Sequence, residues 1–166
     1  MKTIAALLLS CCAGLVWPAA AWAQSAPAPA AVASGAEPAP FDAALAQSLG
    51  ADDAGMRRYV LVILKSGPTP VPAGPERDAM FKGHFSNMSR LSAEGTLALA
   101  GPLDGVEGWR GLYVFAVAGI DEAQRLVATD PVIQRGEMIA EYHAFYGSAA
   151  LMLVRNAHPT LARKKF

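Results

Sequence analysis

A run of six apolar residues, Tyr59 to Leu64 (YVLVIL), constrains the fold of this chain more than any other feature of its sequence. The run is rich in β-branched residues, which favour strands. No polar residue alternates with the apolar ones, so both faces of a strand formed here are apolar. We therefore expect a central strand that is covered on both sides, either within one chain or in the core of a dimer.

A long amphipathic helix is expected after this strand, from Pro75 to Glu94. Proline suits the first turn of a helix, Glu76 and Asp78 follow near the positive end of the helix dipole, and Gly95 ends the helix. One face of this helix comprises Met80, Phe81, His84, Phe85, Met88 and Leu91. The histidine is therefore predicted to face the sheet rather than solvent.

The rest of the domain continues the alternation of strands and helices. In chain order we expect a strand at 96–100, a strand at 111–117, a helix at 121–129, a strand at 138–146 and a short edge strand at 149–154. This order predicts an α+β, ferredoxin-like fold (βαββαβ), with a four-stranded antiparallel sheet and two helices on one face. The other face is apolar and lacks helices, so a second copy of the chain is its simplest cover.

Residues 1–23 have the layout of a secretory signal peptide. A positive charge precedes a short apolar core, and Ala21 and Ala23 stand at positions −3 and −1 of the expected cleavage site. The core is shorter than the ~20 apolar residues that span a bilayer. We therefore expect a periplasmic or secreted protein, cleaved after Ala23, with no stable membrane span. An uncleaved anchor and a lipoprotein acylated at Cys11 or Cys12 are the alternatives.

The remaining composition divides the chain into a linker, one domain and a tail. Residues 24–55 are rich in alanine and proline and contain a candidate short helix at 41–49, residues 56–155 form the domain, and residues 156–166 are a basic tail. The 14 cationic side chains balance 14 anionic ones, so no excess of positive charge indicates a nucleic-acid partner. The 53% of apolar residues excludes a disordered chain.

The sequence from about Arg57 to Leu153 resembles the YCII-related family, small proteins of the dimeric α/β-barrel superfamily. The resemblance rests on the order and spacing of several pieces rather than on any one of them. These pieces are HFSNMSRL (84–91), EGTLALAGPL (94–103), GLYVF (111–115), DEAQ (121–124), Asp130-Pro131 and AEYHAFYGSAAL (140–151).

The resemblance implies a homodimer whose two sheets pack face to face, and a site built from a His–Asp pair. These residues correspond to His84 and Asp130. Some relatives with this fold isomerise, cleave or dehydrohalogenate small cyclic compounds. We therefore expect a small-molecule enzyme in which Asp130 orients His84 as a general acid/base, because a nearby carboxylate fixes the tautomer of an imidazole and raises its basicity.

Each candidate residue also has a simpler interpretation. His84 alone is typical of a core histidine, and Asp130 of a turn before proline. Asn87, Gly101 and Tyr146 are candidate substrate-binding residues, although Asn87 can equally cap the rim and Gly101 can equally end a strand. No cofactor or metal is expected, because the histidines lack ligand spacing and no phosphate-binding glycine loop occurs. A ligand-binding module without chemistry and a structural dimer are the alternative functions.

Overall fold

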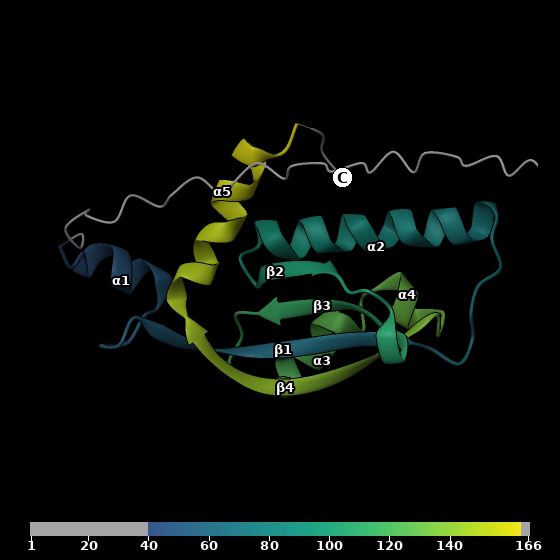
Figure 1. Ribbon diagram of the computed structural model, residues 1–166, viewed down its shortest axis with the longest axis horizontal. Coiled ribbons are helices and arrows are strands. Elements are labelled where there is room, and N and C mark those ends of the chain that lie inside the picture. The colour runs from purple at the N-terminus through teal and green to yellow at the C-terminus, as the bar shows by residue number, and fades with distance from the viewer. Residues whose placement is uncertain (1–39, 164–166) are drawn as a thin grey trace, which may run out of the picture. The chain divides into compact units, whose positions relative to one another are not determined.

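The computed structural model describes residues 40–163, which form one antiparallel sheet flanked by helices (Figure 1). In chain order the elements are α1 (Ala43–Leu49), β1 (Met56–Ser66), α2 (Pro75–Ala93), β2 (Leu97–Pro102), η1 (Val106–Gly108), β3 (Trp109–Phe115), α3 (Ile120–Val127), α4 (Pro131–Gln134), β4 (Met138–Ser148), η2 (Ala149–Leu153) and α5 (Val154–Leu161). The expected signal peptide, its cleavage site and both cysteines lie outside the described residues. Among the helices described, none is long and apolar enough to cross a membrane.

The sheet has the strand order β2-β3-β1-β4, and every neighbouring pair is antiparallel. β1 pairs with β4 without interruption, from Met56 opposite Ser148 to Ser66 opposite Met138. β3 pairs with the other edge of β1. The apolar run from Tyr59 therefore lies in a central strand, as its sequence predicts. The architecture is α+β and is consistent with a ferredoxin-like fold.

The helices α2, α3 and α4 cover one face of the sheet. Val60, Val62 and Leu64 of β1 alternate toward this face and are at most 2% exposed. The core that they form also contains Met80, Leu91, Phe115, Ala123, Val127 and Val132. Burying one aliphatic side chain of this size contributes about 1.5–3 kcal/mol, so this layer is the main source of stability.

The opposite face of the sheet is covered only in part. Tyr59, Val114 and Met152 belong to a smaller buried cluster there, and Leu49 of α1 packs against it. Arg57 Nη1 also donates to the Leu49 carbonyl at 2.7 Å, which holds α1 against the sheet. In Figure 1, α5 rises beyond the end of β4, beside the strands, and α3 lies behind them.

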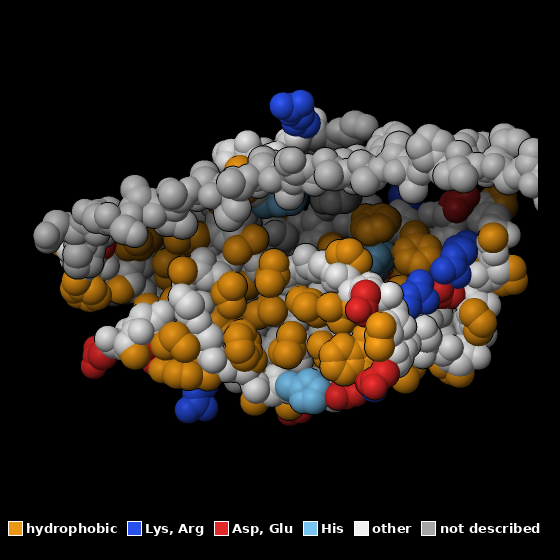
Figure 2. Space-filling model, viewed as in Figure 1, with side chains coloured by type: hydrophobic (Ala, Val, Ile, Leu, Met, Phe, Trp, Pro, Cys, Tyr) orange, Lys and Arg blue, Asp and Glu red, His pale blue; other side chains and the backbone are white. Residues whose placement is uncertain are grey.

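Hydrophobic side chains remain at the surface beyond this smaller cluster, where they gather over the strands (Figure 2). Ile139 is 49% exposed and Phe145 is 36% exposed. Their β1 partners are Lys65 and Tyr59, which share the face opposite α2 and α3. We call this exposed apolar surface, which includes Ile139 and Phe145, the open face.

The segment 149–154 is helical, so the prediction of a short edge strand was wrong. η2 begins where Ser148 Oγ accepts the N–H of Ala150, and α5 continues to Leu161, so the first residues of the expected basic tail belong to a helix. The apolar run buries Met152 in the smaller cluster. An apolar run this short does not distinguish a strand from a helix by its periodicity, and this accounts for the error.

Candidate active site

A buried histidine and a buried aspartate meet between α2 and the start of α4. His84 Nδ1 lies 2.9 Å from Oδ2 and 3.0 Å from Oδ1 of Asp130. The two residues are 7% and 1% exposed. His84 reaches this position because the apolar face of α2 packs on the sheet, as the helical periodicity predicts. The structure therefore brings together the two residues that the family resemblance pairs.

Local backbone structure explains why the Asp130 carboxylate is fixed. The helix expected at 121–129 ends at Val127, and Asp130 is the N-cap of the next short helix, α4. Its Oδ1 accepts the N–H of Val132 at 3.1 Å, which is the usual role of an N-cap aspartate. Pro131 occupies the first helical position, where its missing N–H costs nothing. The Asp-Pro step therefore begins α4, and the preceding helix has already ended at its C-cap, Ala128.

Tyr113 of β3 is a third member of the cluster, and the sequence analysis missed it. Its hydroxyl donates to Asp130 Oδ2 at 2.8 Å and lies 3.3 Å from His84 Nδ1. Burial, and then the negative charge of Asp130, raise the pKa of Tyr113 far above its usual value, so it stays a protonated donor. A tyrosine in an apolar segment such as GLYVF (111–115) needs a partner for its hydroxyl when buried, so its sequence context predicts a buried hydrogen bond.

These contacts determine which nitrogen of His84 carries the proton. Asp130 accepts hydrogen bonds from Tyr113 and Val132, so its carboxylate is an acceptor and Nδ1 of the imidazole donates to it. In the neutral form of the ring, Nε2 is then the nitrogen with the lone pair. Nε2 makes no hydrogen bond within the described residues.

The imidazole is largely enclosed. The His84 side chain keeps 9% of its surface exposed. Its Nε2 is therefore unbonded within the described residues, in a ring that retains a small exposed surface.

Aromatic rings surround the imidazole. Phe81 meets it edge-on with centroids 5.9 Å apart, and Phe85 lies at 5.3 Å. Phe85 is itself 44% exposed. The surface beside the histidine is therefore apolar, which lowers the local dielectric and strengthens the contact with Asp130.

Two contacts hold α2 against the segment that carries Asp130. A Cβ atom on Gly83 would lie 3.0 Å from Pro131 Cγ, so the glycine allows the close approach. Asn87 Oδ1 accepts from Thr129 Oγ1 at 3.1 Å and from Arg90 Nη2 at 2.8 Å. The candidate residue Asn87 thus lies one helical turn from His84, with its amide oxygen already bonded to protein groups.

The structure does not bring Gly101 or Tyr146 to the His–Asp pair. Ala100 pairs opposite Tyr113, and Gly101 pairs opposite Leu112, so Gly101 belongs to the other face of the sheet. Tyr146 lies near the end of β4, where its hydroxyl donates to Asp52. These two candidates occupy other regions of the domain.

The cluster has the groups for proton transfer. It combines an imidazole with a free nitrogen, a fixed carboxylate and a phenol that donates to that carboxylate. In the part of the chain that the structure describes, no three His, Cys, Asp or Glu side chains are grouped so as to hold a metal ion.

A comparison with models of protein families shows to which family this domain is related. Residues 58–145 match the family model of the YCII-related domain, and the match spans more than half of the 166 residues. The chain belongs to the YCII-related domain family. His84, Tyr113 and Asp130 of this YCII-related domain all lie within the matched region. No curated protein matches the sequence.

Proposed function

We propose that this YCII-related protein is a cofactor-free enzyme that uses general acid/base catalysis on a small molecule, in a lyase or isomerase type of reaction. One observation carries the proposal. His84 Nδ1 is held 2.9 Å from the Asp130 carboxylate while Nε2 is unbonded. A carboxylate–imidazole pair of this kind increases the basicity of the outward nitrogen.

The chemistry follows from the two ends of the imidazole. Nε2 accepts a proton from a carbon or hydroxyl group of the substrate, and the Asp130 carboxylate stabilises the imidazolium that forms. The Nε2–H then returns the proton, either to another substrate atom in an isomerisation or to a leaving group in an elimination. Tyr113 holds the carboxylate through its hydrogen bond at 2.8 Å. The exposed ring of Phe85 favours a substrate with an apolar body.

A ligand screen followed by turnover measurements tests this function. Compounds that raise the melting temperature of the protein are identified first, because a ligand of the native state stabilises it. Their conversion is then followed by NMR. We expect His84→Gln to lower turnover by about 100-fold or more, which is the usual contribution of a general acid/base. His143→Gln is the matched control, since His143 is exposed and bonds Glu141 rather than Asp130. Unchanged turnover in His84→Gln would contradict the proposal.

Chemical modification tests whether His84 Nε2 is accessible, and it requires no knowledge of the substrate. Diethyl pyrocarbonate modifies accessible, uncharged imidazole nitrogens, and mass spectrometry locates the modified histidine. We expect wild-type protein to be modified at His84 as well as at the exposed His143. Protection of His84 under conditions that modify His143 fully would show that Nε2 is not available as a base.

A structural role for the cluster is the second candidate. His84, Asp130 and Tyr113 are each at most 7% exposed, and together they join α2, α4 and β3. If this is their only role, His84→Gln lowers the melting temperature without changing conversion of any compound that binds. A binding module gives a third result, in which ligands stabilise the protein and none is converted.

We also propose that the protein is a homodimer that buries the open face. The support is the exposure of Ile139 and Phe145 on a sheet face without a covering helix layer. We expect light scattering after gel filtration to give a dimer, and Ile139→Lys to shift it toward monomer. Val106→Lys is the control, because Val106 is 66% exposed at η1. A monomeric wild-type protein would contradict the proposal.

Export is a separate proposal and rests on the sequence of residues 1–23. Signal cleavage after Ala23 leaves Gln24 as the first residue of a periplasmic or secreted protein. The intact mass of the protein recovered from the cell envelope or medium measures this directly. A mass that retains residues 1–23 would argue against cleavage.

A further inference from the structure

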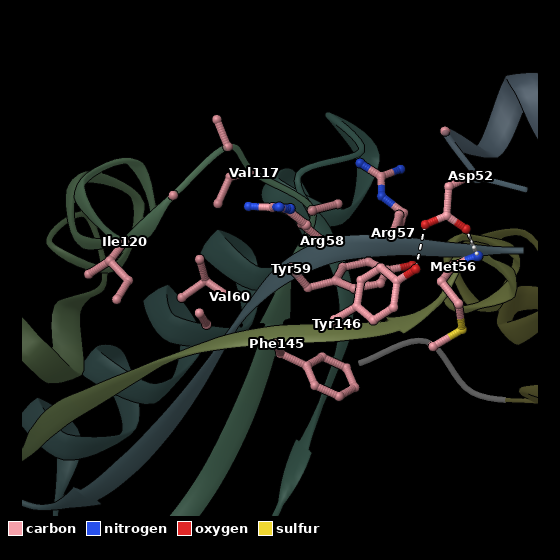
Figure 3. Close-up of a pocket in the computed structure, with 15 residues that line it drawn as sticks. Asp52, Met56, Arg57, Arg58, Tyr59, Val60, Val117, Ile120, Phe145 and Tyr146 are labelled. Carbon is pink, nitrogen blue, oxygen red and sulfur yellow. Dashed lines mark hydrogen bonds between the residues drawn. The ribbon is translucent and has the colours of Figure 1, made fainter. Parts of the chain in front are cut away.

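A cavity of about 930 Å³ lies at the end of the sheet where β1 begins and β4 ends. Its walls come from the α1–β1 connection, the first half of β1, the β3–α3 loop and the end of β4 (Figure 3). Its lining includes neither His84 nor Asp130 nor Tyr113. Tyr146, a candidate ligand-binding residue from the sequence, lies in this cavity. The cavity is therefore distinct from the candidate active site.

Arg58 supplies the cation that distinguishes this cavity. It is exposed and pairs across the strands with Tyr146, so the two side chains share one sheet face. Figure 3 shows its guanidinium group extended toward Val117, away from Asp52. Within residues 40–163 it makes no ion pair or hydrogen bond. Its five N–H donors are therefore available to a ligand.

The carboxylate of Asp52 is held by three hydrogen bonds. Asp52 Oδ1 accepts the N–H groups of Ala54 and Met56, each at 3.0 Å, and Oδ2 accepts the Tyr146 hydroxyl. These hydrogen bonds, with that of Tyr146 the largest, lower the pKa of Asp52, and the same contact raises the pKa of Tyr146. Asp52 therefore orients Tyr146, and within residues 40–163 no hydrogen bond or ion pair joins it to Arg58.

Arg57 also lines the cavity, but it belongs to the other face of β1. Its Nη1 bonds the Leu49 carbonyl and its guanidinium lies 5.3 Å over the Tyr59 ring, but its buried Nε has no partner. No acidic side chain pairs with Arg57 in the described region. Arg57 therefore gives the lining a second guanidinium group, which is held against α1 and the Tyr59 ring.

Apolar side chains complete the lining. They include Val60 and Ala144, on the same sheet face as Arg58 and Tyr146, and Val117 and Ile120. Glu122 accepts the N–H of Ala118 at 3.1 Å, so a second carboxylate lies beside this part of the lining. A cation beside an apolar wall suits a ligand with one negative charge and a compact hydrophobic body.

We propose that this cavity binds a small organic monocarboxylate with a branched or aromatic body, whose carboxylate pairs with Arg58 and whose body packs against Val60, Val117 and Ile120. Guanidinium groups bind carboxylates through two parallel N–H···O bonds, which gives both affinity and orientation. This site is independent of the chemistry at His84.

Calorimetric titration with benzoate and with isovalerate tests the proposal. We expect at least one of them to bind the full-length protein saturably, and the corresponding neutral amide to bind at least about tenfold more weakly. Arg58→Gln should lower the affinity at least about tenfold, because it removes a charge-assisted contact. Arg125→Gln is the matched control, since Arg125 is exposed on α3 outside the cavity, and it should leave the affinity unchanged.

A variant that fills the cavity gives an independent check. Ala144→Leu adds volume on the apolar wall at an exposed position, so it should fold normally and lose binding. The proposal is overturned if neither carboxylate binds saturably, if the amide binds as well as the acid, or if Arg58→Gln binds like the wild type. Because none of these arms involves His84, the result is separable from the test of the proposed enzyme.

Discussion

Replacing Asp130 with alanine is expected to destabilise the domain by about 3 kcal/mol or more, because it removes the acceptor shared by three buried donors. Those donors are His84 Nδ1, the Tyr113 hydroxyl and the Val132 N–H. Each would remain in a region where Asp130 itself is 1% exposed. The N-cap of α4 is lost as well, which alone costs about 1 kcal/mol.

Urea denaturation followed by circular dichroism measures this loss. Asp78→Ala is a suitable control, because Asp78 is an exposed acidic residue in the first turn of α2 and should cost less than about 1 kcal/mol. Asp130→Asn keeps an oxygen that can cap α4, so its cost should lie between those of the two alanine variants. A loss below about 1 kcal/mol in Asp130→Ala would show that water replaces the carboxylate and that the cluster is not sealed.

Glu137→Gln is expected to have the next largest effect, about 2–3 kcal/mol at neutral pH, because Glu137 is the acceptor of a buried ionic cluster. The residue is 2% exposed. Its carboxylate accepts the N–H of Val71 at 2.7 Å and pairs with Arg77 at 2.8 Å and Arg110 at 3.7 Å. These contacts join the β1–α2 connection to the start of β4. Glutamine keeps the shape of the side chain but leaves two arginines without their counter-ion.

The same residue predicts a pH dependence. Burial alone would raise the pKa of Glu137, but the hydrogen bonds from Val71 and Arg77 and the charges of both arginines hold it below its usual value. A carboxyl group whose pKa is lower in the folded than in the unfolded state binds more protons when unfolded. Its stabilising contribution is therefore complete above the unfolded pKa and is lost as pH falls through the folded one.

The free energy of unfolding, measured by denaturation between pH 7 and pH 3, tests whether stability falls with pH in this way. The wild type should lose stability toward acid more steeply than Glu137→Gln, so the two curves should converge at low pH. Glu94→Gln is the control, because Glu94 is exposed and pairs only with Arg90 on the surface of α2. Parallel curves for wild type and Glu137→Gln would mean that Glu137 does not titrate in the folded domain over this range.

The order of the elements was accessible from local patterns. The periods of two and 3.6 residues in β1 and α2 are properties of neighbouring side chains, so the central strand and the inward face of His84 were predicted correctly. The pairing of His84 with Asp130 came from the family resemblance, since no local pattern relates residues 46 positions apart. The segment 149–154 shows the limit of local patterns, because its apolar residues suit a strand and a helix equally.

The sequence by itself determined the four strands of the sheet, the helix α2 and which face of α2 is apolar, because these properties depend on residues a few positions apart. Only the tertiary structure decided that Tyr113 joins His84 and Asp130, from positions 29 and 17 residues away. It also decided that Tyr146 meets Asp52, 94 residues earlier, beside the unpaired Arg58. Contacts between residues so far apart in the sequence depend on strand order and register. Strand order and register arise when distant segments pack together and exclude water, and the local preference of any one segment does not determine them.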